Sequence, residues 1–256
     1  MEAEKRLPVQ IVNPISLNDL PARISYLKSF MDFNQDDGDA INSTKDLIAP
    51  LLPEILDAVY SKLLGYDITA KTFVPRNTGY SGQVAQNVAE LSLSHPQIAR
   101  RKDFLRGYLV KLVSNKDWDD YSSFWDYLNR VGIAHTGKPG LKHRENKPEL
   151  RVEYLHLGLL LGYVVDIVVG AVMEADLETA KKEKAIKSFN KLIWIQNDLF
   201  ARHYIIDPET TEKPKGIEAV KATLVNRPLS SLVLALTTGL SIGTVIALGL
   251  TRPKGN

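Results

Sequence analysis

The chain has 256 residues, of which 44% are hydrophobic and 24% are charged, with a formal net charge of +2 and no cysteine. This is the composition of a folded protein that can bury a core, in one large domain or about two domains of ordinary size. The near-neutral charge, without a basic stripe, argues against a nucleic-acid partner, and the absence of cysteine excludes disulfides, thiolate nucleophiles and thiolate metal sites.

Residues 1–42 are expected to form an N-terminal extension with one helix. The opening MEAEKRLPVQ has no apolar run and carries acidic residues, which argues against a secretory signal. A helix is predicted from about Asp19 to Phe33, because Pro21 falls in its first turn, where the fixed φ of proline is tolerated. The polar residues 34–42 are then expected to break this helix.

The strongest amphipathic pattern follows over residues 52–64 and predicts a helix that ends at Gly65. Before it, Ser43 and Asp46 have the spacing of a capping box. Tyr60 lies inside the apolar stripe of this helix, where its hydroxyl needs a hydrogen-bond partner. The usual partner would be a backbone carbonyl. The alternative, which would give this residue a function, is a ligand bound to iron.

A further helix is predicted from Pro96 to about Asn115, because His95 followed by Pro96 is a typical helix entry. The positively charged side chains at 100–102 are expected to form a solvated face of this helix, with the alternative that one of them reaches a haem propionate. The spacing of the apolar and aromatic positions indicates which side is buried. The residues expected to point inward are Phe104, Leu105, Tyr108, Leu109 and Leu112.

The next predicted helix ends at a histidine on its apolar side. Tyr121, Trp125, Leu128, Gly132 and His135 fall at steps of four, three, four and three, and the following TGKPG cannot easily continue a helix. A histidine in this position, with a glycine one turn earlier that leaves room for a flat ring, is placed as a proximal haem ligand would be. The alternative is a helix cap, with the imidazole hydrogen-bonded to a carbonyl or favoured by the helix dipole.

Two helices complete the predicted globular part, over about 149–174 and 181–204. The first is strongly apolar but contains His156 and Asp166, so we interpret it as the central core helix and not as a membrane span. His156 is expected to be a core histidine with its hydrogen bonds satisfied. No segment alternates convincingly like a strand, which predicts an all-α fold with one buried core.

The tail predicts a single transmembrane anchor. After a linker at 207–227, residues 228–250 form a run of 23 residues without a charge. As a helix this run would be about 35 Å long, enough to cross a hydrocarbon core of about 30 Å. A buried core helix is the alternative, because serine, threonine and glycine dilute the hydrophobicity. Gly239 and Gly243 form a GxxxG pair that would allow helix dimerisation.

A hydrolase elbow, a phosphate-cradling loop, a Rossmann fingerprint and an HExxH pair are all missing, so an enzyme with a protein-only active site is poorly supported. Residues 43–206 instead resemble the globin-sensor or protoglobin family, especially its fungal members. The resemblance rests on ILDAVYSKLL for the second globin helix, RRKDFLRGYLVKLVSN for the distal helix and YLNRVGIAHTG for the proximal helix. The stretches VEYLHLGLLLGYV and KLIWIQNDLFARHYI resemble its last two helices.

This resemblance implies a globin-like fold of the protoglobin type that binds haem b. It implies that His135 binds the iron through Nε2 while Nδ1 donates to a backbone carbonyl. Tyr60 matches the distal tyrosine, which can donate a hydrogen bond to bound dioxygen. Phe104 matches an apolar position of the distal wall that keeps water from the iron.

The chain departs from the family pattern in two places. Bacterial members have a compact Gly-Leu-x-Pro run just after the proximal histidine, whereas here Gly140 and Leu141 are followed by the insertion KHRENKPE. In addition, no methyl-accepting, kinase or cyclase output domain follows the globin-sensor haem domain at 43–206. We therefore do not expect signalling within the chain by the usual family route.

The expected function is reversible binding of dioxygen, CO or NO by a membrane-tethered sensor or gas-binding protein that is not an enzyme. The alternatives are a haem enzyme, such as an NO dioxygenase or one with peroxidase-like activity, and a haem-free, tail-anchored adaptor. The expected partners are the gas, the membrane, a second copy of the chain in a homodimer, and a signalling or reductase protein. The haem domain is expected in the cytosol, with the tail in the mitochondrial outer membrane, the endoplasmic reticulum or the peroxisome.

Overall fold

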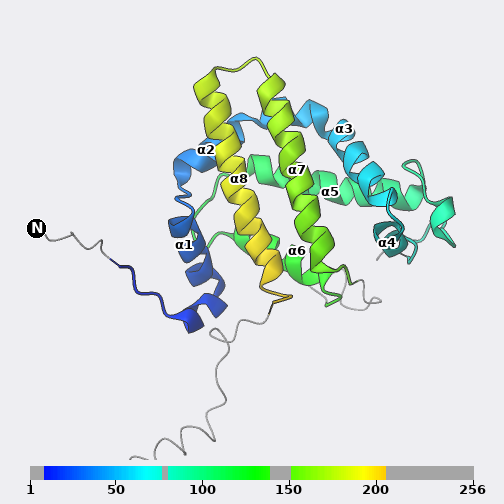
Figure 1. Ribbon diagram of the computed structural model, residues 1–256, viewed down its shortest axis with the longest axis horizontal. Coiled ribbons are helices and arrows are strands. Elements are labelled where there is room, and N and C mark those ends of the chain that lie inside the picture. The colour runs from blue at the N-terminus through cyan, green and yellow to red at the C-terminus, as the bar shows by residue number, and fades with distance from the viewer. Residues whose placement is uncertain (1–8, 77–79, 139–150, 206–256) are drawn as a thin grey trace, which may run out of the picture. The chain divides into compact units, whose positions relative to one another are not determined.

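Helices account for the regular structure of the described residues, which are 9–76, 80–138 and 151–205 of this computed structural model (Figure 1). No strand is formed in these ranges, so the all-α prediction is confirmed for them. Eight α-helices and three short 3₁₀ helices follow one another along the described chain. They are η1 (Pro14–Asn18), α1 (Leu20–Phe30), α2 (Gln35–Ser43), α3 (Lys45–Leu64), α4 (Asp67–Ala70), η2 (Lys71–Phe73), η3 (Val88–Glu90), α5 (Pro96–Ser114), α6 (Ser123–His135), α7 (Tyr154–Glu174) and α8 (Thr179–Ala201).

The first helix, α1, ends at Phe30, before the polar segment that was expected to break it, but that segment was not expected to be helical and forms α2. Asn34 and Asp37 form a capping box, in which each side chain accepts a hydrogen bond from the other's backbone N–H. The Asp37 side chain is fully buried and accepts hydrogen bonds from Lys184 (2.8 Å), Ser188 (2.8 Å) and Lys191 (3.0 Å) of α8. The carboxylate therefore fastens α2 to a helix almost 150 residues further along the chain.

Helix α3 begins earlier than its apolar stripe predicts. Its N-cap is Thr44, with no side-chain capping bond, and the Ser43 hydroxyl donates to the Ala40 carbonyl instead. The predicted capping box of Ser43 and Asp46 is therefore wrong. Pro50 lies inside the helix, as does the proline at 53, and each removes one backbone donor. Burial of the stripe that follows offsets this loss.

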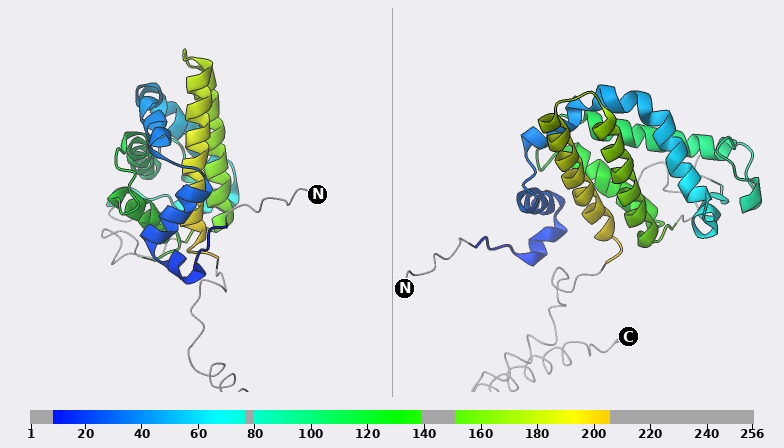
Figure 2. Two further views of the ribbon diagram at one scale, coloured as in Figure 1. Left: turned by 90° about the vertical axis from the view of Figure 1, so that its left-hand side faces the viewer. Right: turned by 45° about the horizontal axis from the view of Figure 1, so that its top comes forward.

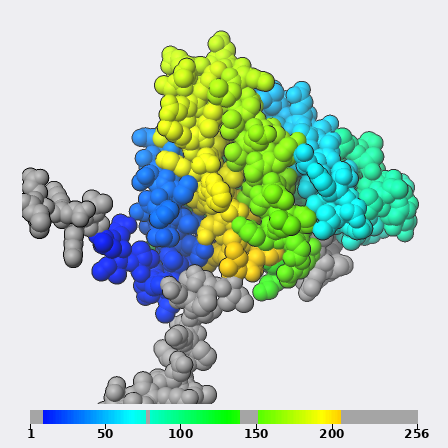
Figure 3. Space-filling model, viewed as in Figure 1, coloured from blue at the N-terminus to red at the C-terminus, as the bar shows by residue number. Residues whose placement is uncertain are grey.

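Helices α7 and α8 form an antiparallel hairpin that packs across the other helices (Figures 1 and 2). Helix α8 contacts α2 and α6 as well as α7, whereas α3 contacts α5 and α7. In the space-filling view, the side chains of the hairpin cover much of the face toward the viewer (Figure 3). Because each of these helices buries one side against neighbours, together they enclose a common core.

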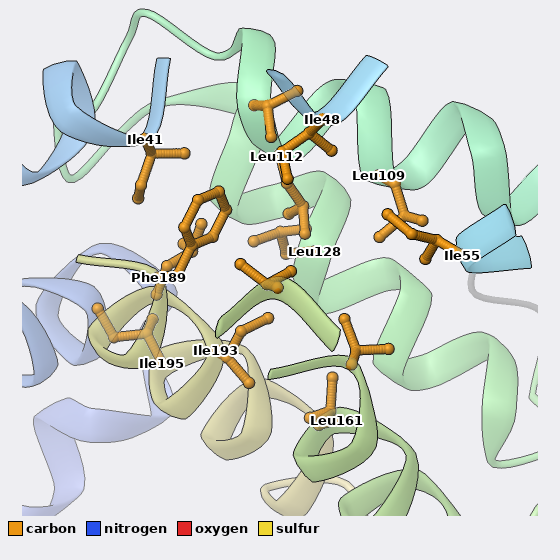
Figure 4. Close-up of a cluster of buried hydrophobic side chains, with 14 of the residues drawn as sticks. Ile41, Ile48, Ile55, Leu109, Leu112, Leu128, Leu161, Phe189, Ile193 and Ile195 are labelled. Atoms are coloured by element: carbon orange, nitrogen blue, oxygen red, sulfur yellow. The ribbon is translucent and has the colours of Figure 1, made fainter. Parts of the chain in front are cut away.

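The core lies between the hairpin and the helices that it crosses, and its side chains are aliphatic and aromatic (Figure 4). Burying one such side chain contributes about 1.5 to 3 kcal/mol relative to leaving it exposed. Many of these side chains are completely enclosed. Those without exposed surface include Ile24, Ile41, Val59, Ile98, Trp125, Leu128, Leu192, Ile195 and Leu199.

Helix α7 is long and apolar enough, by length and composition, to cross a membrane, and it alone among the described helices meets that test. The sequence pattern predicted a central core helix. One side of α7 is indeed in the core, but Leu155 and Leu159 on another side are 63% and 65% exposed. The core interpretation therefore holds for one side only. The buried side consists of Leu157, Leu161, Val164, Val168 and Val172.

Several predicted segments lie outside the described residues. They are the insertion KHRENKPE, the linker at 207–227 and the tail anchor at 228–250. The chain divides into two units, Met1–Thr210 and Thr211–Asn256, and all described residues belong to the first. That unit includes α1, which begins after Asp19 as predicted; the Asp19 carboxylate accepts a hydrogen bond from the backbone N–H of Ala22.

Candidate functional site

A cavity of about 320 Å³ lies among α3, α5, α6, α7 and α8. Its walls are mostly apolar, with a small number of polar side chains among them, which is the usual make-up of a site for a small molecule or cofactor. All three predicted site residues line it. The polar and aromatic side chains in the lining are Tyr60, Thr69, Thr72, Phe73, Arg101, Phe104, Tyr108, Tyr127, His135, His156 and Phe200.

Helix α6 brings His135 to this cavity and ends there, as predicted. The Nδ1 atom of His135 lies 2.7 Å from the backbone carbonyl oxygen of Val131, one turn earlier. When Nδ1 donates to that carbonyl, the lone pair of Nε2 is left to bind a metal. The ring also packs against Phe200 of α8, with 5.7 Å between the centroids. Two neighbouring helices therefore set the orientation of the imidazole.

Main-chain hydrogen bonds join the residues just before the insertion to the residues just after it, next to His135. Beyond the insertion, the backbone N–H of Val152 donates to the carbonyl of His135 over 2.9 Å. Thr136 and Arg151 form an isolated antiparallel bridge beside it. The end of α6 is thus connected to the start of α7 by main-chain hydrogen bonds, which further limit movement of His135.

The start of α6 differs from the prediction. The helix begins after Ser122, whose hydroxyl oxygen accepts a hydrogen bond from the backbone N–H of Phe124. Tyr121 precedes the helix and is 82% exposed, so it does not belong to the apolar side. That side begins at Trp125, which is completely buried.

Gly132 has a different role from the one expected. A Cβ atom at this position would lie 2.5 Å from the backbone oxygen of Leu199 and 3.2 Å from ring carbons of both His203 and Phe200. Gly132 does not line the cavity. It therefore does not leave room for a flat ring; it allows the backbones of α6 and α8 to approach closely.

Tyr60 is buried in the cavity wall, and its ring packs against Phe73 with 5.7 Å between the centroids. Its hydroxyl forms no hydrogen bond with another described residue, so the expected backbone carbonyl partner is not found. Burial raises the pKa of Tyr60 far above that of an exposed tyrosine, against the opposing effect of the Arg101 charge. The phenol is therefore a protonated donor at neutral pH.

Arg101 was expected on a solvated face, but its side chain is buried in the cavity wall. The guanidinium carbon lies 4.9 Å from the centroid of the Phe73 ring, a cation–π contact. The sequence places three basic residues in a row on α5, and only packing decides which of them turns inward. The cavity thus contains a positive charge close to Tyr60.

Phe104 lines the cavity but exposes 48% of its surface, so it lies at the edge. The guanidinium of Arg100 stacks 5.3 Å from the centroid of its ring. One turn later, Tyr108 also lines the cavity, and its hydroxyl oxygen is covered. The spacing on α5 correctly placed both rings on one side, without indicating which lies deeper.

His156 lines the cavity from the first turn of α7, and its ring forms no hydrogen bond with another described residue. The expectation of a satisfied core histidine is therefore wrong. Leu157, Leu160 and Leu161 line the cavity from the same part of α7. Helical spacing relative to these leucines was the signal that could have placed His156 at the site.

The residues present fit a haem. Among the described residues, no group of three or more histidine, cysteine or acidic side chains is arranged to hold a bare metal ion. Haem iron, in contrast, needs only one protein ligand in a globin; His135 lines the cavity with its Nδ1 atom against the Val131 carbonyl, so Nε2 is the atom that would bind the iron. The apolar walls suit a porphyrin, and the protonated phenol of Tyr60 supplies a hydrogen-bond donor in the same wall.

Comparison with known proteins identifies the family and the fold. A family model described as Protoglobin matches residues 20–210. The globin domain of a Geobacter sulfurreducens globin-coupled sensor has the same fold, with a TM-score of 0.51 and 15% identity over 71% of this chain and 97% of that one. A comparison with curated proteins gives no match. The chain therefore belongs to the protoglobin family, whose globin-like fold is that of a haem protein that binds gases.

Proposed function

We propose that this protein reversibly binds dioxygen, and also CO and NO, at the iron of a haem b held by Nε2 of His135. One observation carries the proposal: an oriented imidazole and an unpartnered phenol, that of Tyr60, line the same apolar cavity. The role is gas sensing or gas binding, without catalytic turnover. Consumption of NO in the presence of a reductase would instead identify a haem enzyme.

Haem, when held by His135, would supply an iron atom that can bind a diatomic ligand. The protonated Tyr60 phenol, which lines the same cavity, would donate a hydrogen bond to a ligand with partial negative charge. Such a bond to a charged acceptor contributes about 1.5 to 3 kcal/mol, or roughly tenfold to a hundredfold in affinity. Phe104 narrows the edge of the cavity and limits the entry of water.

The test is the visible absorption spectrum of the full chain purified with haem, in ferric, ferrous and CO-bound forms. We expect stoichiometric haem in the wild type, weak or displaced binding in His135→Ala, and faster dioxygen release in Tyr60→Phe. Tyr163→Phe is a matched control, because that ring lies under Lys62 and outside the cavity lining. A wild type without haem, or an unchanged ferrous spectrum in His135→Ala, would overturn the site and favour a haem-free adaptor.

We further propose that residues 228–250 anchor the protein in a membrane, with the haem domain in the cytosol. The support is the uncharged run of 23 residues and the GxxxG pair, which would also allow a homodimer. The mitochondrial outer membrane, the endoplasmic reticulum and the peroxisome all suit such a tail. Alkaline carbonate should extract a chain that stops at Asn226 from membranes but should leave the full chain behind. Complete extraction of both would refute the anchor.

A further inference from the structure

Gln97 is a completely buried amide side chain near the start of α5. Its Nε2 atom donates to the carbonyl oxygens of Phe73 and Pro75, each over 2.7 Å. Its Oε1 atom accepts a hydrogen bond of 3.3 Å from the backbone N–H of Ala85. A buried amide must have such partners, because leaving its donors or its acceptor unpaired is costly. Gln97 therefore fastens two separate stretches of the chain to α5.

Phe73, the last residue of η2, lines the cavity and connects Gln97 to Tyr60. The centroid of the Phe73 ring lies 5.7 Å from that of the Tyr60 ring and 4.9 Å from the guanidinium carbon of Arg101. Arg101 follows Gln97 by about one turn of α5, so the two side chains lie on the same side of the helix. Helix α5 thus holds Phe73 at two points, at its carbonyl oxygen through Gln97 and at its ring through Arg101.

The direction of the Tyr60 phenol depends on the packing of its ring. The Tyr60 hydroxyl forms no hydrogen bond with another described residue, so the neighbours of the ring decide where the hydroxyl points, and Phe73 is one of them. A hydrogen bond weakens steeply when its distance or angle departs from the best values. Movement of the Phe73 ring would therefore weaken a hydrogen bond from Tyr60 to a ligand in the cavity.

We propose that Gln97 is a positioning residue of the gas-binding site: it fixes the main chain at Phe73 and, through that ring, keeps the Tyr60 phenol directed at the ligand. This inference rests on the proposed function for the identity of the ligand. The placement of Tyr60 by Gln97, in contrast, is a property of the chain alone. It can therefore be measured with haem and without it.

The first experiment observes the Tyr60 ring in the haem-free full chain by NMR, with tyrosine labelled with ¹³C in its ring. The Tyr60 signal is the one that Tyr60→Phe lacks. Gln97→Met keeps the length of the side chain but removes its donors and its acceptor. We expect this variant to shift the Tyr60 signal, because the magnetic effect of the Phe73 ring on Tyr60 changes with the distance between the rings.

Gln97→Glu is the milder variant of the same position. Burial keeps the carboxyl group protonated at mildly acidic pH, so this side chain retains the acceptor and one of the two donors. It should shift the Tyr60 signal in the same direction as Gln97→Met but by less. Circular dichroism identifies the variants that fold, and an unchanged Tyr60 signal in any folded variant of Gln97 would overturn the inference.

Asn42→Leu is a matched control for the loss of a buried amide. The Asn42 side chain, on α2, donates to the carbonyl oxygens of Val113 and Asn115 over 3.0 and 2.7 Å, at the other end of α5. Asn42 does not line the cavity. Its replacement removes two main-chain contacts, as that of Gln97 does, but it should leave the Tyr60 signal unchanged. A shift equal to that of Gln97→Met would show general loosening of α5 and would refute a specific role.

The second experiment measures dioxygen release and the C–O stretching frequency of the CO complex in the haem-loaded full chain. Gln97→Met should release dioxygen about threefold to tenfold faster than the wild type and raise the C–O frequency, because the hydrogen bond from Tyr60 is weakened. In the Tyr60→Phe background, Gln97→Met should have no further effect, since it acts through the phenol. Additive effects of the two substitutions would contradict the inference.

The outcomes separate this inference from the proposed function. If the wild type takes up no haem, the proposed function fails, whereas a shifted Tyr60 signal in Gln97→Met still supports the placement of Tyr60 by Gln97. If the wild type binds haem and dioxygen but Gln97→Met changes neither the Tyr60 signal nor dioxygen release, the function stands and the role of Gln97 is refuted.

Discussion

Replacing Asp37 by asparagine is expected to destabilise the fold by about 1 to 2 kcal/mol at neutral pH. The substitution keeps the size of the side chain but removes the charge that lies between Lys184 and Lys191. Burial by itself raises the pKa of Asp37. The hydrogen bonds from Lys184, Ser188, Lys191 and the Asn34 N–H outweigh that effect and lower the pKa from 3.8 to about 2.

The magnitude follows from this difference in pKa. A difference of nearly two pH units corresponds to roughly 2.5 kcal/mol of stability. Part of it is lost to solvent screening, because the Lys184 side chain is 41% exposed. Since the folded pKa lies below the unfolded one, the contribution is fully present above about pH 4 and disappears as the pH falls toward 2.

Thermal unfolding followed by far-ultraviolet circular dichroism at several pH values measures this effect. Asp37→Asn should unfold about 2 to 8 °C below the wild type at pH 7, and the two curves should converge at low pH. Asp36→Asn, on the exposed side of the same helix, is the control and should shift stability by no more than about 0.5 kcal/mol. Equal stability of Asp37→Asn and wild type at pH 7, or a gap that persists at low pH, would refute the reasoning.

Gly132→Ala should destabilise the protein by about 1 to 3 kcal/mol and speed the loss of haem from His135, because the new Cβ would lie 2.5 Å from the Leu199 oxygen. Thermal unfolding and haem transfer to an acceptor globin measure these two effects. Gly158→Ala is the control and should be nearly neutral, because its new Cβ would lie 3.9 Å from the Asn197 side-chain oxygen, an ordinary contact distance. Burial, and then nearby positive charges, lower the pKa of His203 to about 4. As the pH falls, His203 therefore takes up a proton in the unfolded chain before it does so in the folded protein. The stability of the fold should decrease as the pH drops below about 6.5. The free energy of unfolding in urea should decrease less between pH 7 and pH 5 for His203→Gln than for the wild type. An identical decrease in both proteins would contradict this role of His203.

The sequence predicted those features that depend on neighbours in the chain. The end of α6 at His135 follows from the TGKPG run, and the buried side of α3 follows from its apolar spacing. Both depend on backbone preference and helical periodicity, which short stretches contain. The family resemblance was likewise visible in the order of the helices and is confirmed by the match over residues 20–210.

Features that depend on distant partners could not be predicted. Residues 34–42 look like a helix breaker until Asp37 meets two lysines of α8, far away in the chain. Spacing places Gly132 on one side of α6 but does not reveal that its neighbour is the backbone of Leu199. For the same reason, the hydrogen bonds from Gln97 to the main chain at Phe73 and Pro75 belong to the assembled fold, and no local pattern contains them.

The close approach at Gly132 makes α6 and α8 one stiff body in mechanical terms. No side chain at 132 separates the two helix backbones and could adjust its conformation. A displacement of His135 toward α8 should therefore also displace the backbone at Leu199. Leu199 lies in the last turn of α8, just before the chain continues toward its C-terminal segment. The position of the His135 imidazole is thus mechanically coupled to the C-terminal end of α8.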